Sequence, residues 1–212
     1  MTVVIFEGPD NLGKSTIIDS LIRDYKNVRD IYMMHSTGPH CKEGEDPFEY
    51  QKNVFYSKVK KMIALNDTNK VSEVKSDDII IMDRSWIGEY VYGQLYRDGD
   101  DKKILDMINT CNIMLMSNNI SCVFIQLDAS PEFIISKDDN KSFTSSYDKD
   151  KRLSTVKHEI KLFNEVFDKM WIDEKTMTKF KVNVQYNKKG YRVLSELNEE
   201  IKRHILETDI RL

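Results

Sequence analysis

The feature that most constrains this chain is a glycine-framed loop near its N-terminus. An apolar run at positions 3–6 leads into Gly8, and Gly13, Lys14 and Ser15 follow at the spacing G-x-x-x-x-G-K-S/T. The backbone N–H groups of such a loop can wrap a chain of phosphates, provided that few side chains intervene. Apolar residues at positions 17, 18, 21, 22 and 25 then indicate an amphipathic helix. Strand, loop and helix together predict a phosphate-binding loop.

The residues of this loop have distinct expected roles. Lys14 brings a full positive charge, and the helix that starts there adds the partial positive charge of its N-terminus. The Ser15 hydroxyl is suited to bind Mg²⁺ beside the phosphates of a nucleoside triphosphate. We expect the whole loop to contact that nucleotide through Gly8, Asn11, Leu12, Gly13, Lys14, Ser15 and Thr16.

Strand and helix patterns alternate along the rest of the chain. Apolar runs at 31–34, 79–82, 122–127 and 180–186 predict four more strands, the last of them at a sheet edge. Helical spacing of apolar residues appears at 48–65, 104–115, 155–170 and 191–206, and Ser130-Pro131-Glu132 is typical of a helix start. The alternation predicts an α/β three-layer sandwich, in which a five-stranded parallel sheet has helices on both faces. A nucleotide would bind at the carboxyl ends of the strands.

Size and composition indicate one soluble domain. The 212 residues are 40% hydrophobic and 32% charged, and they contain no apolar stretch long enough to span a membrane. The first strand starts at once, so we expect no signal peptide and a cytoplasmic protein. Cys41, Cys111 and Cys122 lack metal-type spacing and are expected to be reduced thiols. The net charge of −3 argues against a nucleic-acid polymer as partner.

One polar stretch, residues 136–154, fits neither pattern. A solvated surface loop is the simplest interpretation. The alternative is a lid that closes over the triphosphate and excludes water. Such a lid would neutralise phosphate charge with one of its cations: Lys137, Lys141, Lys149, Lys151 or Arg152.

A second motif, Asp83-Arg84-Ser85, follows the apolar run at 79–82. An acid at the end of a buried strand is the expected partner of a phosphate loop, because it can hold Mg²⁺ directly or through water. An aspartate that only caps the next helix is the alternative. Arg84 favours the first interpretation, because a guanidinium binds phosphate through two parallel hydrogen bonds.

These motifs resemble those of one family. Residues 6–16 resemble the F-E-G-x-D-G-x-G-K-S/T-T opening of thymidylate kinases, and Asp83-Arg84-Ser85 is similar to their D-R motif. The end of the fourth strand, Leu127 to Glu132, resembles the L-x-x-x-P-E of thymidylate and deoxynucleoside kinases. The resemblance runs over nearly the whole chain and implies a P-loop kinase that phosphorylates a deoxynucleoside monophosphate. It implies ATP and Mg²⁺ as cofactors, a pyrimidine acceptor such as dTMP, and a homodimer. The small size and the composition suggest a divergent phage member.

The resemblance also implies roles for the acceptor side. Asp10 would accept a hydrogen bond from the 3′-hydroxyl of the sugar, and Arg84 would bind the acceptor phosphate. Asp83 would orient Mg²⁺. Phe55 would stack on the base, although a plain core aromatic is an equal alternative.

Some positions depart from the family pattern. The family has a phosphate-binding arginine one turn after the stacking phenylalanine, where this chain has Val59 between Lys58 and Lys60. Tyr92 matches the tyrosine of the family's A-Y-Q, but Gly93 replaces the glutamine. Arg97 is a further cation for the acceptor pocket.

The positively charged side chain that stabilises the transition state is also expected at a different position. Some thymidylate kinases carry an arginine in the phosphate loop, and others carry arginines in the lid. Here Asn11 occupies the loop position, so we expect Arg152 or a lid lysine to supply this charge.

Three alternatives stay open from the sequence. A deoxynucleoside kinase would need a carboxylate base, for which Glu43 or Glu45 is available after the second strand. A kinase that acts on a DNA end or a modified base would require a basic surface, which the composition does not indicate. A nucleotide-binding module without activity would not need Lys14, Ser15 and Asp83 together.

Overall fold

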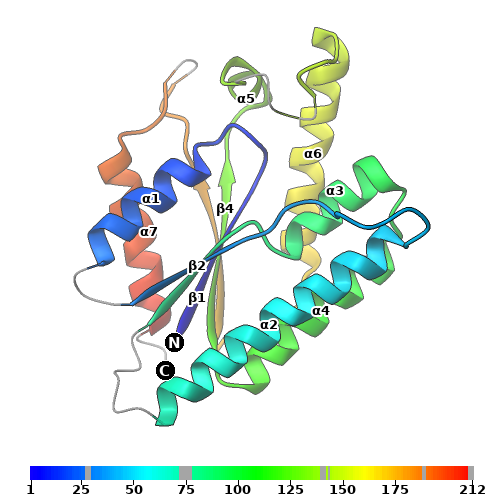
Figure 1. The fold of residues 1–212 in the computed structure, drawn as a ribbon. Helices are drawn as coiled ribbons and strands as arrows, with labels where there is room; N and C mark the ends of the chain where they lie inside the picture. Colours follow the sequence, from blue (N-terminus) through cyan, green and yellow to red (C-terminus); the bar gives the residue numbers. More distant parts are fainter. Residues whose placement is uncertain (27–29, 72–77, 139–141, 143, 188–189, 210–212) are drawn as a thin grey trace.

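The computed structural model confirms the expected α/β architecture (Figure 1). It describes the chain except for residues 27–29, 72–77, 139–141, 143, 188–189 and 210–212. Five parallel strands form one sheet in the order β2-β3-β1-β4-β5. The strands are β1 (Thr2–Glu7), β2 (Ile31–His35), β3 (Ile79–Asp83), β4 (Ser121–Asp128) and β5 (Met177–Asn183).

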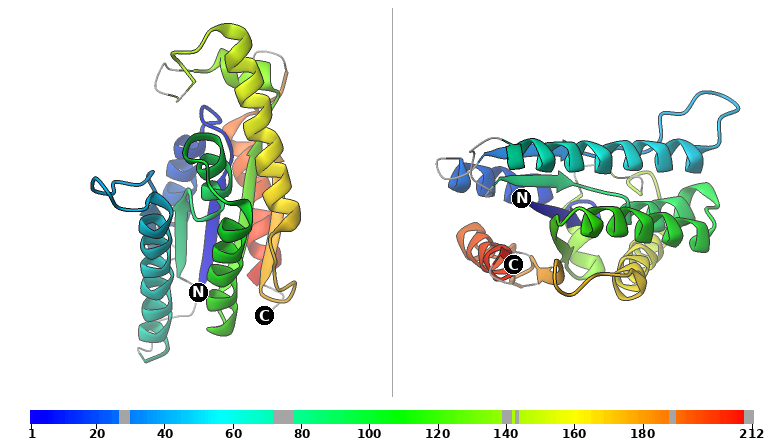
Figure 2. Two further views of the ribbon diagram at one scale, coloured as in Figure 1. Left: turned by 90° about the vertical axis from the view of Figure 1, so that its right-hand side faces the viewer. Right: turned by 90° about the horizontal axis from the view of Figure 1, so that it is seen from below.

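Helices cover both faces of this sheet (Figures 1 and 2). One face carries α1 (Lys14–Tyr25) and α7 (Leu194–Asp209). The other carries α2 (Pro47–Val71), α3 (Ile87–Arg97), α4 (Asp101–Ser117) and α6 (Lys149–Lys169). The short α5 (Pro131–Ser136) follows β4 at the carboxyl edge of the sheet.

Two hydrophobic cores fill the layers. Successive strand side chains point to opposite faces, so Val3 and Ile5 join the core under α2, α3, α4 and α6. Val4 and Phe6 join the core under α1 and α7. This double burial explains why the central strands are apolar at every position rather than at alternate positions.

The strand order determines where a ligand can bind. β1 is the middle strand, and the chain leaves it toward β2 on one side and later reaches β4 on its other side. The loop after β1 therefore lies where the connections diverge, which is the usual binding position in open parallel sheets. The phosphate loop and the Asp83 motif both lie at this edge because β1 and β3 are adjacent and parallel.

Several element boundaries differ from the sequence-based expectation. α6 begins at Lys149 rather than near residue 155, because the Asp148 carboxylate accepts hydrogen bonds from the backbone N–H groups of Asp150 and Lys151. The polar segment is thus shorter than expected, and Lys149, Lys151 and Arg152 lie in the first turn of a helix. Lys141, another expected lid cation, lies outside the described residues. β5 is an edge strand as expected, but it runs from Met177 to Asn183.

Other expectations concern the chain as a whole. All three cysteines are free thiols. In the part of the chain that the structure describes, no helix combines the length and the apolarity that crossing a membrane requires.

Candidate active site

Gly8 is the residue that lets the phosphate loop pass close to β4. Its φ is 130°, and a Cβ at this position would lie 2.5 Å from the carbonyl oxygen of Leu127. No side chain can occupy that space, and the backbone angle is itself unfavourable for an L residue. Gly13, which precedes α1, also has a positive φ of 73°. The loop pattern is therefore required by packing as well as by phosphate binding.

We predict that Gly8→Ala destabilises the protein by about 3 kcal/mol or more, because strain in φ and overlap with a backbone carbonyl add together. Gly44→Ala is the matched control, since Gly44 has a φ of 84° but nothing within 4 Å of the added Cβ. Gly44→Ala should lower the free energy of unfolding by about 1 kcal/mol. Urea unfolding of the two variants measures both values, and equal losses would contradict the packing explanation.

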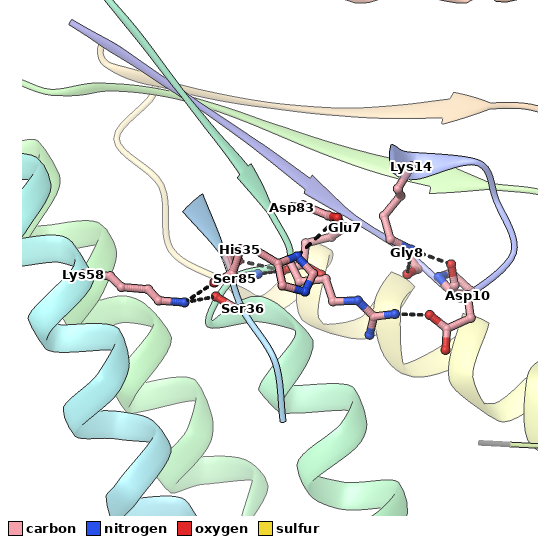
Figure 3. Close-up of polar contacts among 11 residues, drawn as sticks. Glu7, Gly8, Asp10, Lys14, His35, Ser36, Lys58, Asp83 and Ser85 are labelled. Carbon is pink, nitrogen blue, oxygen red and sulfur yellow. Dashed lines mark hydrogen bonds and ion pairs between the residues drawn. The ribbon is translucent and has the colours of Figure 1, made fainter. Parts of the chain in front are cut away.

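Lys14 lies inside the curve of the loop (Figure 3). Its ammonium group donates to the carbonyl oxygens of Gly8 and Pro9 at 2.8 and 2.7 Å. Burial lowers the pKa of Lys14, and the nearby Arg84 guanidinium lowers it further. A phosphate placed in the loop would give this ammonium a charged acceptor in exchange for two neutral ones.

A cavity of about 300 Å³ opens in front of the loop. We call it the phosphate cavity. It is lined by Asp10, Asn11, Leu12, Gly13, Lys14, Ser15, Thr16, His35, Asp83 and Arg84. The structure therefore brings all the expected nucleotide-binding residues except Gly8 to one cavity wall, and Gly8 shapes the loop behind it.

Asp83 is suited to a hydrated Mg²⁺ at this cavity. One carboxylate oxygen lies 3.3 Å from Nδ1 of His35, which belongs to none of the sequence motifs. The other oxygen, Oδ1, is buried and has no hydrogen-bond partner within the described part of the chain. Ser15 lines the same cavity. Among the described residues no group of three or more histidine, cysteine or acidic side chains could hold a metal by itself. Mg²⁺ usually keeps several waters and binds through one or two carboxylates plus substrate phosphates.

Arg84 and Asp10, which both line the phosphate cavity, form an ion pair. Arg84 has a φ of 66°, and its backbone N–H donates to the Phe6 carbonyl at 3.1 Å. The guanidinium lies over the ring of Tyr92, with its carbon 5.3 Å from the ring centre. The structure thus brings together Asp10 and Arg84, which the resemblance implied for sugar and phosphate, and places Tyr92 beside them.

A second cavity, which we call the α3 pocket, lies next to Arg84. Its walls come from the loop after β2 and from α2 and α3, with Ser36, Thr37, Gly38, Gln51, Phe55, Arg84, Ser85, Gly88, Glu89, Tyr92 and Arg97 as lining residues. Phe55 belongs to the hydrophobic core and also lines this pocket, so both of its expected roles are compatible with the structure.

The α2 positions near Phe55 do not replace the missing family arginine. Val59 is fully buried. The Lys58 ammonium donates to the His35 carbonyl at 2.6 Å and to the Ser36 hydroxyl at 2.7 Å (Figure 3), and burial lowers its pKa. Lys58 therefore holds the loop after β2 and is not among the residues that line the α3 pocket.

Arg152 is connected to the phosphate loop indirectly, because both contact the carboxylate of Asp138. Its guanidinium forms an ion pair with Asp138. The same carboxylate accepts hydrogen bonds from the Asn11 amide at 3.4 Å and from the Ser142 hydroxyl at 3.1 Å. Asp138 thus joins the loop, the polar segment and α6. Sequence reasoning missed Asp138, because no local pattern marks an acid that is bound to residues so distant along the chain.

Glu7 is a further residue whose role the motif alone did not reveal. It is fully buried, and one of its oxygens accepts hydrogen bonds from the backbone N–H and the hydroxyl of Ser85, each at 2.6 Å. Burial raises the pKa of Glu7. The contact ties the end of β1 to the Asp83-Arg84-Ser85 turn and so positions the two motifs relative to each other.

Glu159 is the most unusual acid at the site. It projects from α6 beside Asp10 and Asn11, it is 5% exposed, and it accepts a hydrogen bond from the Tyr92 hydroxyl at 2.8 Å. Burial raises its pKa to about 7. The sequence carried one signal for this burial, because Glu159 lies on the same apolar helix face as Val156 and Phe163.

Glu159 should make stability depend on pH. The pKa of its carboxyl is higher in the folded protein than in an unfolded chain. Ionising the buried carboxyl therefore costs folding free energy, and this cost is absent in acid and grows as pH rises from about 4.5 to about 7. We therefore compare the free energy of unfolding of Glu159→Gln with that of the parent. The difference in favour of the variant should be about 2 kcal/mol larger at pH 8 than at pH 5. Urea unfolding at the two pH values measures this difference, and a constant gap would contradict the raised pKa.

Comparison with known proteins supports the fold. The sequence gives no match to a protein-family model and no significant match to a curated protein. Solved structures match over almost the whole chain at low identity. Polyphosphate kinase 2 from Arthrobacter aurescens TC1 is 13% identical with a TM-score of 0.63, over 99% of this chain and 67% of that one.

Two other structures extend this result. The YorR protein from Bacillus subtilis, solved in complex with phosphorylated GDP, is 16% identical with a TM-score of 0.58. The match covers 99% of this chain and 98% of YorR. A putative polyphosphate kinase 2 from Pseudomonas aeruginosa PA01 is 14% identical with a TM-score of 0.57, and the match covers 97% of this chain and 42% of that one. The fold is therefore that of P-loop kinases, and these matches do not single out thymidylate kinases.

Proposed function

We propose that this protein transfers the γ-phosphate of ATP to a deoxynucleoside monophosphate and releases ADP and the diphosphate. The observation that carries the proposal is the position of Arg84, which lines both the phosphate cavity and the α3 pocket. A guanidinium between a phosphate loop and an aromatic pocket can bind the phosphate of an acceptor whose base occupies that pocket. Asp10, which is paired to Arg84, would accept a hydrogen bond from the sugar hydroxyl of the same acceptor.

The transfer itself requires alignment more than acid–base chemistry. An oxygen of the acceptor phosphate attacks the γ-phosphorus, the bond from that phosphorus to the β-phosphate oxygen breaks, and ADP leaves with the electron pair. A nucleotide phosphate is already largely ionised at neutral pH, so no base has to remove a proton. Bound Mg²⁺, near Ser15 and Asp83, would neutralise charge on the donor phosphates. Lys14 and Arg152 would stabilise the charge that spreads over the transferred group.

The structure disfavours a deoxynucleoside kinase, which would need a base for a sugar hydroxyl. Both candidates for that base, Glu43 and Glu45, are exposed. Glu45 accepts a hydrogen bond from the backbone N–H of Lys42 at 2.9 Å within its own turn. Neither of these acids lines the α3 pocket.

The similar structures support nucleotide chemistry in two ways. YorR was solved with a phosphorylated guanine nucleotide, and this chain spans nearly all of it. Two others are named polyphosphate kinase 2, which makes polyphosphate a second candidate phosphoryl donor. The thymidylate kinase motifs and the side chain of Phe55 make a deoxynucleotide with a stacked base the acceptor that we propose, with dTMP as the starting expectation.

A paired assay tests this proposal. ADP release from ATP and Mg²⁺ is measured with each deoxynucleoside monophosphate and with the corresponding nucleoside. Turnover with a monophosphate but not with its nucleoside is the expected result. Turnover of nucleosides alone would overturn the proposal, and polyphosphate in place of ATP would show which donor is used.

A further inference from the structure

His35 lines the phosphate cavity, but the transfer steps described above do not use it. It ends β2, and the parallel pairing of β2 with β3 places it directly beside Asp83, which ends β3. Its Nδ1 lies 3.3 Å from Oδ2 of Asp83, and its side chain is 53% exposed (Figure 3). The end of β2 thus brings an imidazole to the acid that we expect to orient Mg²⁺.

Contacts on two sides fix the backbone at His35. The backbone N–H of Ser36 donates to the Asp83 carbonyl at 3.1 Å, so the pairing of the two strands continues one residue beyond His35. From α2, the Lys58 ammonium donates to the His35 carbonyl at 2.6 Å and to the Ser36 hydroxyl at 2.7 Å (Figure 3). The imidazole therefore projects from a backbone that is held in place, although the ring itself is half exposed.

The permanent cations at the cavity have other partners than Asp83. Lys14 donates to two carbonyl oxygens of the phosphate loop, and Arg84 is paired to Asp10. Within the described part of the chain, Oδ1 of Asp83 is buried and has no hydrogen-bond partner. The contact between Oδ2 and the His35 imidazole can therefore set the rotation of this carboxylate.

The rotation of a carboxylate matters when it binds a metal ion or the waters of that ion. Side chains that hydrogen-bond to such a carboxylate orient it, and removing them typically lowers metal affinity or activity by about 10- to 100-fold. Lys14 and Arg84 line the same cavity as Asp83. A carboxylate that was free to turn could pair with one of these cations, and it would then be lost to Mg²⁺.

We propose that His35 is a positioning residue, which holds the Asp83 carboxylate through Nδ1 so that this carboxylate can bind Mg²⁺ or its waters. The imidazole acts as a hydrogen-bond donor, with a proton on Nδ1, and it does not touch the metal ion or the phosphates. This inference rests on the proposed function and deepens it, because it concerns the Mg²⁺ that would accompany the donor nucleotide.

Two substitutions separate the two nitrogens of the imidazole. In His35→Asn the amide nitrogen is as many bonds from Cα as Nδ1 is, so this variant keeps the donor to Asp83. In His35→Gln the amide nitrogen takes the place of Nε2 instead, and His35→Ala removes both donors. His40→Ala is the matched control, because His40 contacts Thr37 at 3.1 Å in the loop after β2 and is not among the residues that line the phosphate cavity.

The test measures metal binding rather than turnover. Mn²⁺ takes the same oxygen ligands as Mg²⁺, and electron paramagnetic resonance counts the free ion. The dissociation constant of Mn²⁺ is measured for the complex of each variant with a non-hydrolysable ATP analogue. We expect His35→Ala and His35→Gln to raise this constant about tenfold, and His35→Asn and His40→Ala to leave it within about threefold of the parent value. Binding of the analogue without metal should be the same for all five proteins.

Three results would overturn the inference. The first is an equal Mn²⁺ affinity in the parent and in His35→Ala. The second is retention of Mn²⁺ affinity by His35→Gln and its loss in His35→Asn, because Nε2 would then contact the phosphates directly. The third is weaker binding of the analogue in the absence of metal, which would assign His35 to the nucleotide rather than to Asp83. If His35→Ala does not fold, the comparison of His35→Asn with His35→Gln decides.

Failure of this inference differs from failure of the proposed function. If the parent phosphorylates deoxynucleoside monophosphates while every His35 variant binds Mn²⁺ as the parent does, only the role of His35 fails. If the parent binds the analogue and Mn²⁺ but phosphorylates no monophosphate, the proposed function fails, and the Mn²⁺ series still decides the role of His35.

Discussion

Arg152→Ala should lower kcat for phosphoryl transfer by about 10³, the lower end of the range for an inserted arginine in this chemistry. Asn11 leaves the phosphate loop without an arginine, and Arg152 is joined to that loop through Asp138. In the reacting complex Arg152 would exchange the Asp138 carboxylate for the transferring phosphate. KM for ATP should change much less than kcat, because this charge acts mainly in the transition state.

The neighbouring lysine provides the control for this prediction. Lys151 lies in the same helical turn but is exposed, with its ammonium 4.1 Å from the centre of the Tyr147 ring. Lys151→Ala should leave kcat within about twofold, a change in barrier of roughly 0.4 kcal/mol. Single-turnover measurements on both variants test the assignment. A loss of less than about twofold for Arg152→Ala, or a larger loss for Lys151→Ala, would contradict it.

Lys14→Met should reduce kcat/KM for ATP by about 10²–10³, as expected when a buried donor to the transferring group is removed. Methionine keeps the length and the apolar stem, so the loop should still fold. The variant also removes the donor to the carbonyl oxygens of Gly8 and Pro9, so its free energy of unfolding is measured beside its kinetics.

Lys60→Met is the matched control, because Lys60 is exposed on α2. Steady-state kinetics at saturating acceptor, together with equilibrium binding of ATP, separate loss of transfer from loss of binding. A Lys14→Met protein with undiminished turnover would show that the loop does not hold the phosphates during transfer.

Much of the fold and the donor site could be predicted because their signals are local. The phosphate loop is one strand–loop–helix unit with fixed spacing, and continuous apolar runs marked β3 and β4 as buried strands. Asp83 ends β3 and Arg84 follows it directly, so parallel pairing of β3 with β1 was enough to bring them to the loop.

The acceptor side was less predictable because its polar residues lie within apolar helix faces. Glu89 and its partner Arg97 are eight residues apart on α3, beyond the spacing of a local helical pair. The partner of Glu159 on α6 is Tyr92 on α3, which is known only once the two helices are packed together. The boundary of the polar segment was missed because Asp148 caps α6 earlier than the apolar pattern starts. Such contacts depend on tertiary packing, which periodicity does not encode.

The central claim is tested most directly by identifying the products of one reaction. The protein is incubated with ATP, Mg²⁺ and dTMP, and the mixture is followed by ³¹P NMR and by separation of the nucleotides. The account predicts equal amounts of ADP and dTDP, no product with thymidine, and loss of both signals in Lys14→Met. Conversion of ATP to ADP and free phosphate without any deoxynucleoside diphosphate, across all four deoxynucleoside monophosphates, would contradict it.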